Sequence, residues 1–326
     1  MTNRKKGFAL LGSVLFAALL VTLFLKYFGE AGLQARIDSN LDQALQGRLA
    51  ARAGLSMGLA LLFQDRNPTD DYDESWSEIP RLTSKYPIEV GNGTCSVTIS
   101  DEAAKLNVNL SDEETLTTLF EKFDLGLLGS ATIFGEPIRQ GASRRLAQHI
   151  LDYLDLDDSP RPMGAETDAY RAQNLPPPRN SPMLDIRELR NIPGLTPELF
   201  FRQGRRPGLS DLLTVEGEGF INLNTARREV VESIPGPPGY FGEKRKAYFD
   251  ALYKCLPFKR VAGYYDFLVS YDPWIQKQYS NRFVLFSSFF RVESEGWVGK
   301  VVRRMTAFVV RSRVGEYQVK RLEEVP

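Results

Sequence analysis

An uncharged apolar segment at residues 8–25 lies close to the N-terminus, directly after three basic residues at positions 4–6. A helix of about twenty apolar residues spans the hydrocarbon core of a bilayer, and basic residues mark its cytoplasmic end. The segment therefore predicts a single membrane anchor with a cytoplasmic N-terminus. A cleaved secretory signal is the alternative, with Gly29 and Ala31 as the small residues of its cleavage site.

The polar sequence after the anchor keeps the periodicity of a helix. Apolar residues recur there mostly every three or four positions, with polar residues between them, namely Leu33, Ile37, Leu41, Leu45, Leu49, Leu55, Leu59 and Leu62. The pattern predicts one continuous helix from Phe8 to about Phe63. We expect its first part to be apolar all round and its second part to carry one apolar stripe, whose first five members form a surface for partner helices.

The totals describe an ordinary globular chain after the anchor. Of 326 residues, 43% are hydrophobic, and 41 basic residues balance 41 acidic ones, so no overall field favours nucleic acid. His149 is the only histidine, which excludes histidine triads and multi-histidine metal sites. Cys95 and Cys255 would meet an oxidising compartment after export, where a pair of cysteines could form a disulfide. Their wide spacing favours two free thiols instead.

Strand and helix signals after residue 64 predict an α+β fold in which helices interrupt an antiparallel sheet. Residues 65–78 suggest a surface loop, residues 87–99 a hairpin around Gly91, and residues 105–110 a further strand. Ser111 with Glu114 predicts a capping box at the start of a helix, and helical spacing returns near residues 146–154. Strand signals resume at residues 220–223, 282–292 and 301–310. We predict a sheet domain at 65–110 and 216–326, with a helical insertion at 111–215.

Six acidic residues crowd residues 152–168, namely Asp152, Asp155, Asp157, Asp158, Glu166 and Asp168. Ca²⁺ takes six to eight oxygen ligands in flexible geometry, so a turn-rich acidic segment suits it, although the spacing is not that of an EF-hand. A solvated acidic loop is the alternative. The pattern makes this segment the leading candidate for a metal site.

Gly7 stands between the basic cluster and Phe8, at the head of the long helix. This arrangement resembles the class III leader of type IV pilins and pseudopilins, and the resemblance implies cleavage by a prepilin peptidase between Gly7 and Phe8, with methylation of the new N-terminus. Most members of that family carry Glu at the fifth mature position, where this chain has Gly12. Within the pseudopilins, that absence resembles the K component of the type II secretion system.

Several phrases along the chain also resemble the K component. They are DEAAKLNVNL at 101–110, LDYLDLDDSPRPMGAETDAY at 151–170, NSPML at 180–184 and GFINLNTA at 219–226. The resemblance covers most of the chain and is weakest between about residues 227 and 280. It implies a minor pseudopilin at the tip of the pseudopilus, anchored in the bacterial inner membrane with a periplasmic head, and it implies assembly with the I and J components and the major pseudopilin.

The resemblance also implies calcium in the acidic segment. The matching positions make Asp155, Asp157, Glu166 and Asp168 the leading ligands, with Asp158 and Asn180 as further candidates. Together with the residue types, this favours a structural Ca²⁺ ion over a merely solvated loop.

Residues 189–199 and 221–239 resemble helix-hairpin-helix units, in which a glycine turn presents backbone N–H groups to a phosphate. A membrane-anchored DNA receptor of competence type is therefore the alternative function. The turn at Gly194 lacks a second glycine and loses a donor to Pro197, so a pseudopilin is favoured and nucleic acid is an unexpected partner.

No nucleophile or phosphate-binding motif is present, and we expect no enzyme; a carboxylate-based hydrolase is the enzymatic alternative.

Overall fold

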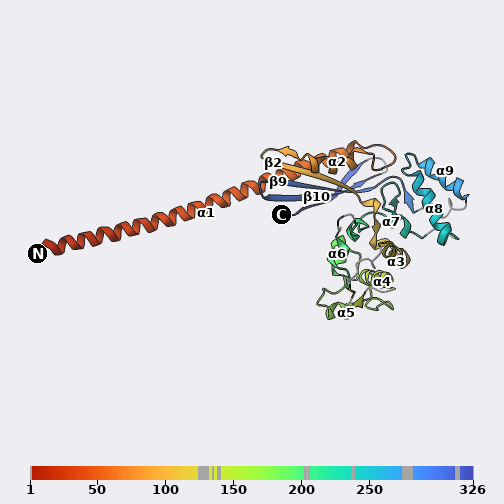
Figure 1. The fold of residues 1–326 in the computed structure, drawn as a ribbon, viewed down its shortest axis with the longest axis horizontal. Helices are drawn as coiled ribbons and strands as arrows, with labels where there is room; N and C mark the ends of the chain where they lie inside the picture. The colour runs from red at the N-terminus through yellow and green to blue at the C-terminus, as the bar shows by residue number, and fades with distance from the viewer. Residues whose placement is uncertain are drawn as a thin grey trace.

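The computed structural model describes residues 2–123, 132–133, 136–137, 141–201, 204, 206–235, 239–273, 282–312 and 316–325. A long helix leads into a head in which a sheet adjoins the helix and a helical part lies beyond the sheet (Figure 1). The α-helices are α1 (Thr2–Gln64), α2 (Ser75–Lys85), α3 (Glu113–Lys122), α4 (Ala142–Leu154), α5 (Thr167–Ala172), α6 (Pro197–Phe200), α7 (Arg228–Ser233), α8 (Gly242–Cys255) and α9 (Val261–Tyr271). The strands are β1 (Ile88–Val90), β2 (Gly93–Asp101), β3 (Leu106–Asn107), β4 (Thr132–Ile133), β5 (Glu136–Pro137), β6 (Leu213–Thr214), β7 (Ile221–Asn222), β8 (Phe283–Val284), β9 (Phe289–Val298), β10 (Val301–Arg311) and β11 (Tyr317–Val325).

Helix α1 confirms the predicted continuous helix and extends it at both ends. Every residue from 11 to 42 is exposed, and its apolar window has a mean hydropathy of 2.0. Within the described residues, α1 alone is long and apolar enough to cross a membrane. The structure thus supports a single membrane anchor that continues without interruption into the head.

The last part of α1 lies directly on the sheet because small residues face it. An added Cβ at Gly54 would lie 2.3 Å from Ser294 Oγ, and one at Gly58 would lie 2.6 Å from Val292 Cγ1. On the sheet side, an added Cβ at Gly296 would lie 2.2 Å from the backbone oxygen of Gly47. Helix and sheet therefore touch backbone to backbone, which fixes the direction in which the stem leaves the head.

A five-stranded sheet in the order β1-β2-β9-β10-β11 forms the first part of the head, and all of its neighbouring strands are antiparallel. The hairpin predicted at residues 87–99 is confirmed as β1 and β2, with Gly91 at a φ of +59° in the turn. Helices α1 and α2 pack against the sheet, with a core that includes Leu55, Trp76 and Phe290. These features confirm the predicted α+β fold.

A second hydrophobic core holds the helical part together and extends from Leu106 to Leu285. It contains residues of α3 and α4 as well as residues of α7, α8 and α9. The core is therefore continuous across the domain boundary predicted between residues 215 and 216, and the domain division stays a prediction.

Cys95 is buried in β2 whereas Cys255 is exposed at the end of α8, and both thiols are free.

Four details of the sequence-based expectation were wrong, and one strand was missed. Residues 65–78 are not simply a surface loop, since Asp70 is fully buried and α2 begins at Ser75. The N-cap of α3 is Asp112, which accepts a hydrogen bond from the Thr115 N–H, rather than Ser111. The strand expected at residues 105–110 is confined to β3, and the one expected at residues 282–292 divides into β8 and β9. Strand β11 was missed because charged residues occupy both of its faces.

Candidate functional site

The acidic segment follows α4 and wraps back toward α5. Asp155 is the C-cap of α4 and Glu166 is the N-cap of α5, so the two helix ends set the span of the loop. One carboxylate oxygen from each of Asp155, Asp157 and Glu166 lies within 4.8 Å of the others. The fold therefore brings together three of the carboxylates that the sequence analysis selected as leading ligands.

Four oxygens at this cluster have no hydrogen-bond donor among the described residues, whereas Asp155 Oδ2 accepts from Arg161 and Asp157 Oδ1 accepts from the Ser159 N–H. Asp155 Oδ1, both carboxylate oxygens of Glu166 and Asn180 Oδ1 are buried and unpartnered. Glu166 is only 6% exposed. The burial of its carboxyl group is the larger cause, and the charges of the nearby aspartates the smaller one, that raise its pKa to about 7. Buried oxygens without donors are costly unless a cation meets them, and this set of carboxylate and amide oxygens suits a hard divalent cation.

The remaining predicted ligands lie at the edge of the cluster or away from it. Asp158 Oδ1 accepts a hydrogen bond from Thr167 Oγ1 at 3.1 Å and one from Asn180 Nδ2 at 3.4 Å. Asp168 is 96% exposed and pairs with Arg171 at 2.9 Å. The structure thus places Asn180 beside the cluster and Asp158 at its rim, and it does not bring Asp168 to it. The ligand set as a whole stays a prediction.

Two buried groups near the cluster were not among the ligands selected from the sequence, although Asp152 was counted in the acidic segment. Asp152 is fully buried on the last turn of α4, and its carboxylate pairs with Arg161. Tyr170 on α5 is also fully buried, and its hydroxyl has no hydrogen-bond partner among the described residues. Helical spacing from Leu146 through Ile150 predicts an inward face for α4, but it does not predict that a carboxylate beside that face is buried.

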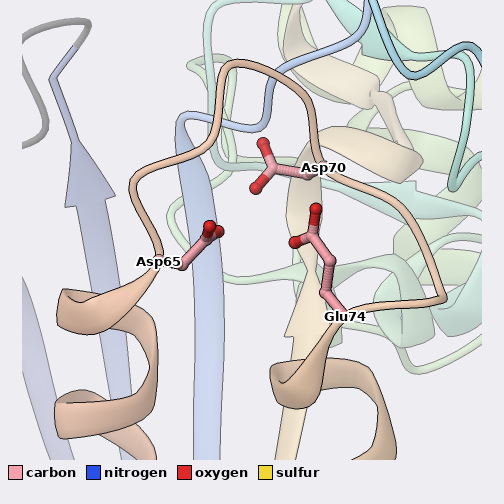
Figure 2. Close-up of side chains that lie close together, drawn as sticks. All are labelled: Asp65, Asp70 and Glu74. Carbon is pink, nitrogen blue, oxygen red and sulfur yellow. The ribbon is translucent and has the colours of Figure 1, made fainter.

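A second acidic cluster, formed by Asp65, Asp70 and Glu74, lies where α1 passes into α2. Figure 2 shows the three carboxylates turned toward a common space, with Asp65 at the end of α1, Glu74 at the start of α2 and Asp70 on the loop between them. Arg311 donates to Asp65 Oδ2 at 2.9 Å and also to Asp70 Oδ2. Glu74 accepts from the Trp76 indole at 2.6 Å. Because Arg311 already supplies a cation, this cluster is a structural ion-pair network that ties the loop to β10.

The phrase at residues 219–226 has a structural role at the junction of the two parts of the head. Asn222 Nδ2 donates to Ser287 Oγ at 2.7 Å, and Thr225 Oγ1 donates to Asp101 Oδ2 at 2.6 Å. All four residues are buried. These side chains join β2, β7 and the segment after β8, so they do not form a surface that meets a phosphate.

The other helix-hairpin-helix-like unit is also engaged within the fold. Gly194 makes its turn at a φ of +88°, and His149 Nδ1 lies 3.0 Å from the backbone oxygen of Pro193. The helix after the turn, α6, spans four residues. Arg206 donates to the backbone oxygen of Phe123, while the neighbouring basic positions 202 and 205 lie outside the described residues. This unit offers no long helix whose N-terminus could hold an anion.

The predicted partner stripe of α1 is exposed along its whole length. Its members are between 43% and 64% exposed, and they are Leu33, Ile37, Leu41, Leu45 and Leu49. Gly7 and Phe8 lie in the first turns of α1. The stripe therefore has no partner within the described part of the chain, and the processing site remains a prediction.

Comparisons with known proteins agree with the resemblance seen in the sequence. Residues 105–203 match the family model described as type II secretion system (T2SS), protein K. The type II secretion system protein K of Pectobacterium carotovorum is 30% identical over 215 residues, and that of Klebsiella pneumoniae is 27% identical over 218 residues. Each alignment covers 62% of this chain and 62% of the relative, so the similarity spans about three fifths of the relatives' length.

The fold is similar to that of a chain in the crystal structure of the GspK-GspI-GspJ complex from the type 2 secretion system of enterotoxigenic Escherichia coli. The TM-score is 0.60 at 21% sequence identity, and the superposition covers 90% of this chain and 99% of that chain. The architecture of a stem helix, an antiparallel sheet and a helical part is therefore shared with a solved structure.

Proposed function

Because this chain is related to type II secretion system protein K through residues 105–203, we propose that it is a minor pseudopilin of a type II secretion system. Its work is assembly: it takes part in starting the pseudopilus and thereby in protein export across the outer membrane. The observation that carries this proposal is α1, one helix of 63 residues whose first part is exposed and apolar and whose last part is packed on an antiparallel sheet.

The membrane placement of this proposal follows from charge. Basic residues at positions 4–6 precede the anchor and favour a cytoplasmic N-terminus in the inner membrane, which puts the head in the periplasm. A prepilin peptidase would cut between Gly7 and Phe8 and leave the whole apolar helix on the mature chain.

A position at the tip of the pseudopilus is supported by the two ends of the molecule. An added Cβ at Gly12 meets nothing within 4 Å, so the glycine is not required by packing within the chain. A carboxylate at this position would serve to meet the N-terminal amine of a subunit ahead, and a tip subunit has no such neighbour. The helical part also extends the head away from the axis of α1 (Figure 1), which a closed helical lattice would not accommodate.

The partners in this proposal are the I and J components, and beneath them the major pseudopilin. The apolar stripe from Leu33 to Leu49 lies along the stem outside the membrane segment, and an apolar helix face left in water favours association with similar helices. The solved structure of similar fold is a GspK-GspI-GspJ complex.

A structural Ca²⁺ ion belongs to the same proposal. Asp155, Asp157 and Glu166 would hold it together with Asn180, because their unpartnered buried oxygens converge. When bound, the cation supplies the positive charge that these carboxylates lack. None of the comparisons supports the competence-type DNA receptor. The relatives are components of a secretion system, which agrees with an absence of catalysis.

The test is co-purification of the full-length chain with tagged I and J components from membranes in mild detergent. We expect a complex that Leu41→Lys together with Leu45→Lys weakens, because two charges would enter an apolar helix contact. Leu82→Lys is the matched control, since Leu82 is an exposed leucine on α2, outside the stem. Binding of duplex DNA at physiological salt, with no binding of either pseudopilin, would overturn the proposal in favour of the DNA receptor.

A further inference from the structure

We propose that Asp152 and Arg161 form an internal counter-ion pair that keeps Asp155 available to the cation in the acidic loop. In this arrangement neither residue is a metal ligand. Both are positioning residues, and Arg161 is a tethered cation whose charge is shared between two carboxylates. The inference rests on the Ca²⁺ ion of the proposed function.

Arg161 reaches both carboxylates with one atom. Its Nη1 donates to Asp152 Oδ1 and to Asp155 Oδ2, each at 2.5 Å. Its backbone N–H also donates to Asp152 Oδ2 at 3.2 Å. Asp152 is fully buried and Arg161 is 32% exposed at its side chain, so the buried carboxylate holds the arginine from two directions while Asp155 receives only one contact.

Gly164 lies against the Asp152 carboxylate. Its N–H donates to the Arg161 backbone oxygen at 2.9 Å, which makes a turn of residues 161–164. An added Cβ at Gly164 would lie only 1.8 Å from Asp152 Oδ2 and 3.0 Å from the Arg161 nitrogen. The turn therefore lies directly against the Asp152 carboxylate, with no space there for a side chain at residue 164.

In this geometry one oxygen of the Asp155 carboxylate binds Arg161 and the other is free to bind the proposed Ca²⁺ ion. Its Oδ2 is held by Arg161, whereas its Oδ1 is buried, unpartnered and part of the cluster with Asp157 and Glu166. If Asp152 lost its charge, the guanidinium charge would act on Asp155 alone and repel a metal ion. If Arg161 lost its charge, Asp152 would add an uncompensated negative charge beside the site.

The two substitutions should therefore change metal affinity in opposite directions. Calorimetric titration of the full-length chain in detergent with Ca²⁺ alone tests this. We expect Asp152→Asn to weaken binding tenfold or more and Arg161→Gln to tighten it at least threefold. The double variant should return to within threefold of the wild type. Arg171→Gln is the control, since Arg171 forms only an exposed pair with Asp168, and it should leave the affinity unchanged.

Three results would overturn the inference. If both single variants weaken binding, the pair only supports the local structure. If the double variant binds as weakly as Asp152→Asn, Asp152 is itself a ligand. If the wild-type chain does not bind Ca²⁺, the metal site and this inference fall together, while co-purification with the other pseudopilins still decides the proposed function. Should Arg161→Gln fail to fold, the comparison of Asp152→Asn with the double variant gives the decision.

Discussion

Replacing Glu166 by Gln should remove a pH dependence from the stability of the metal-free head. The pKa of Glu166 rises from 4.5 to about 7 because the carboxyl group is buried among other carboxylates. A raised pKa in the folded state means that the contribution of this group to stability is fully present below pH 4.5 and is lost as the pH rises through about 7. In the presence of a chelator, the wild-type head should therefore become less stable between pH 5 and pH 8.

The size of the effect follows from the shift. At about 1.4 kcal/mol for each pKa unit, Glu166 lowers the free energy of unfolding by at most about 3.5 kcal/mol at pH 8 relative to pH 4.5. Glu166→Gln keeps the shape of the side chain and removes its charge. It should therefore stabilise the chelated head at pH 8 by up to this amount and abolish the stabilisation by added Ca²⁺.

The assay is thermal unfolding of the full-length chain at several pH values, followed by circular dichroism, with chelator or with millimolar Ca²⁺. Glu114→Gln is the matched control, because Glu114 is exposed on α3. An unchanged pH slope in Glu166→Gln would refute the argument, as would equal stabilisation of wild type and variant by Ca²⁺.

Three further outcomes are expected. Gly58→Ala should destabilise the head by about 1–3 kcal/mol in thermal unfolding, because its new methyl group would overlap the sheet, whereas Gly32→Ala, where nothing lies within 4 Å, should not destabilise it; equal effects would contradict the close packing of α1. Mass spectrometry of the mature chain from membranes should show Phe8 as the first residue, and a start at Gly32 would instead support a secretory signal. Arg311→Met should lower stability by about 3–5 kcal/mol, because it leaves buried carboxylates without their cation; an unchanged melting temperature would show that the network is not needed.

Elements with a strong local pattern were predictable from the sequence. The helical periodicity up to residue 62 gives α1, and the alternation around Gly91 gives β1 and β2. In both cases hydrogen bonds between near neighbours satisfy the backbone, so short-range sequence is sufficient. Strand β11 lacks such a pattern. Its identity as a strand depends on pairing with β10, which supplies the hydrogen bonds.

In the acidic loop, too, one part could be predicted from the sequence and another part depended on the fold. Its composition alone pointed to oxygen ligands for a cation, and that expectation required no coordinates. Which oxygens converge was a matter of packing: Glu166 is buried beside Asp155, whereas Asp168, only two residues further on, faces solvent. A turn directs consecutive side chains to different sides, and the sequence does not state which side becomes the interior.

The sequence by itself determined a membrane helix that continues into the head, an α+β fold and an acidic segment. Only the tertiary structure showed that Arg311, 241 residues from Asp70 in the chain, pairs with two carboxylates of a second acidic cluster. It also showed that the phrase containing Asn222 and Thr225 lies buried at the junction of the two parts. The physical reason is distance along the chain. Periodicity and composition report interactions between near neighbours, whereas the partner of a buried charge is set by which remote segments the cores bring into contact.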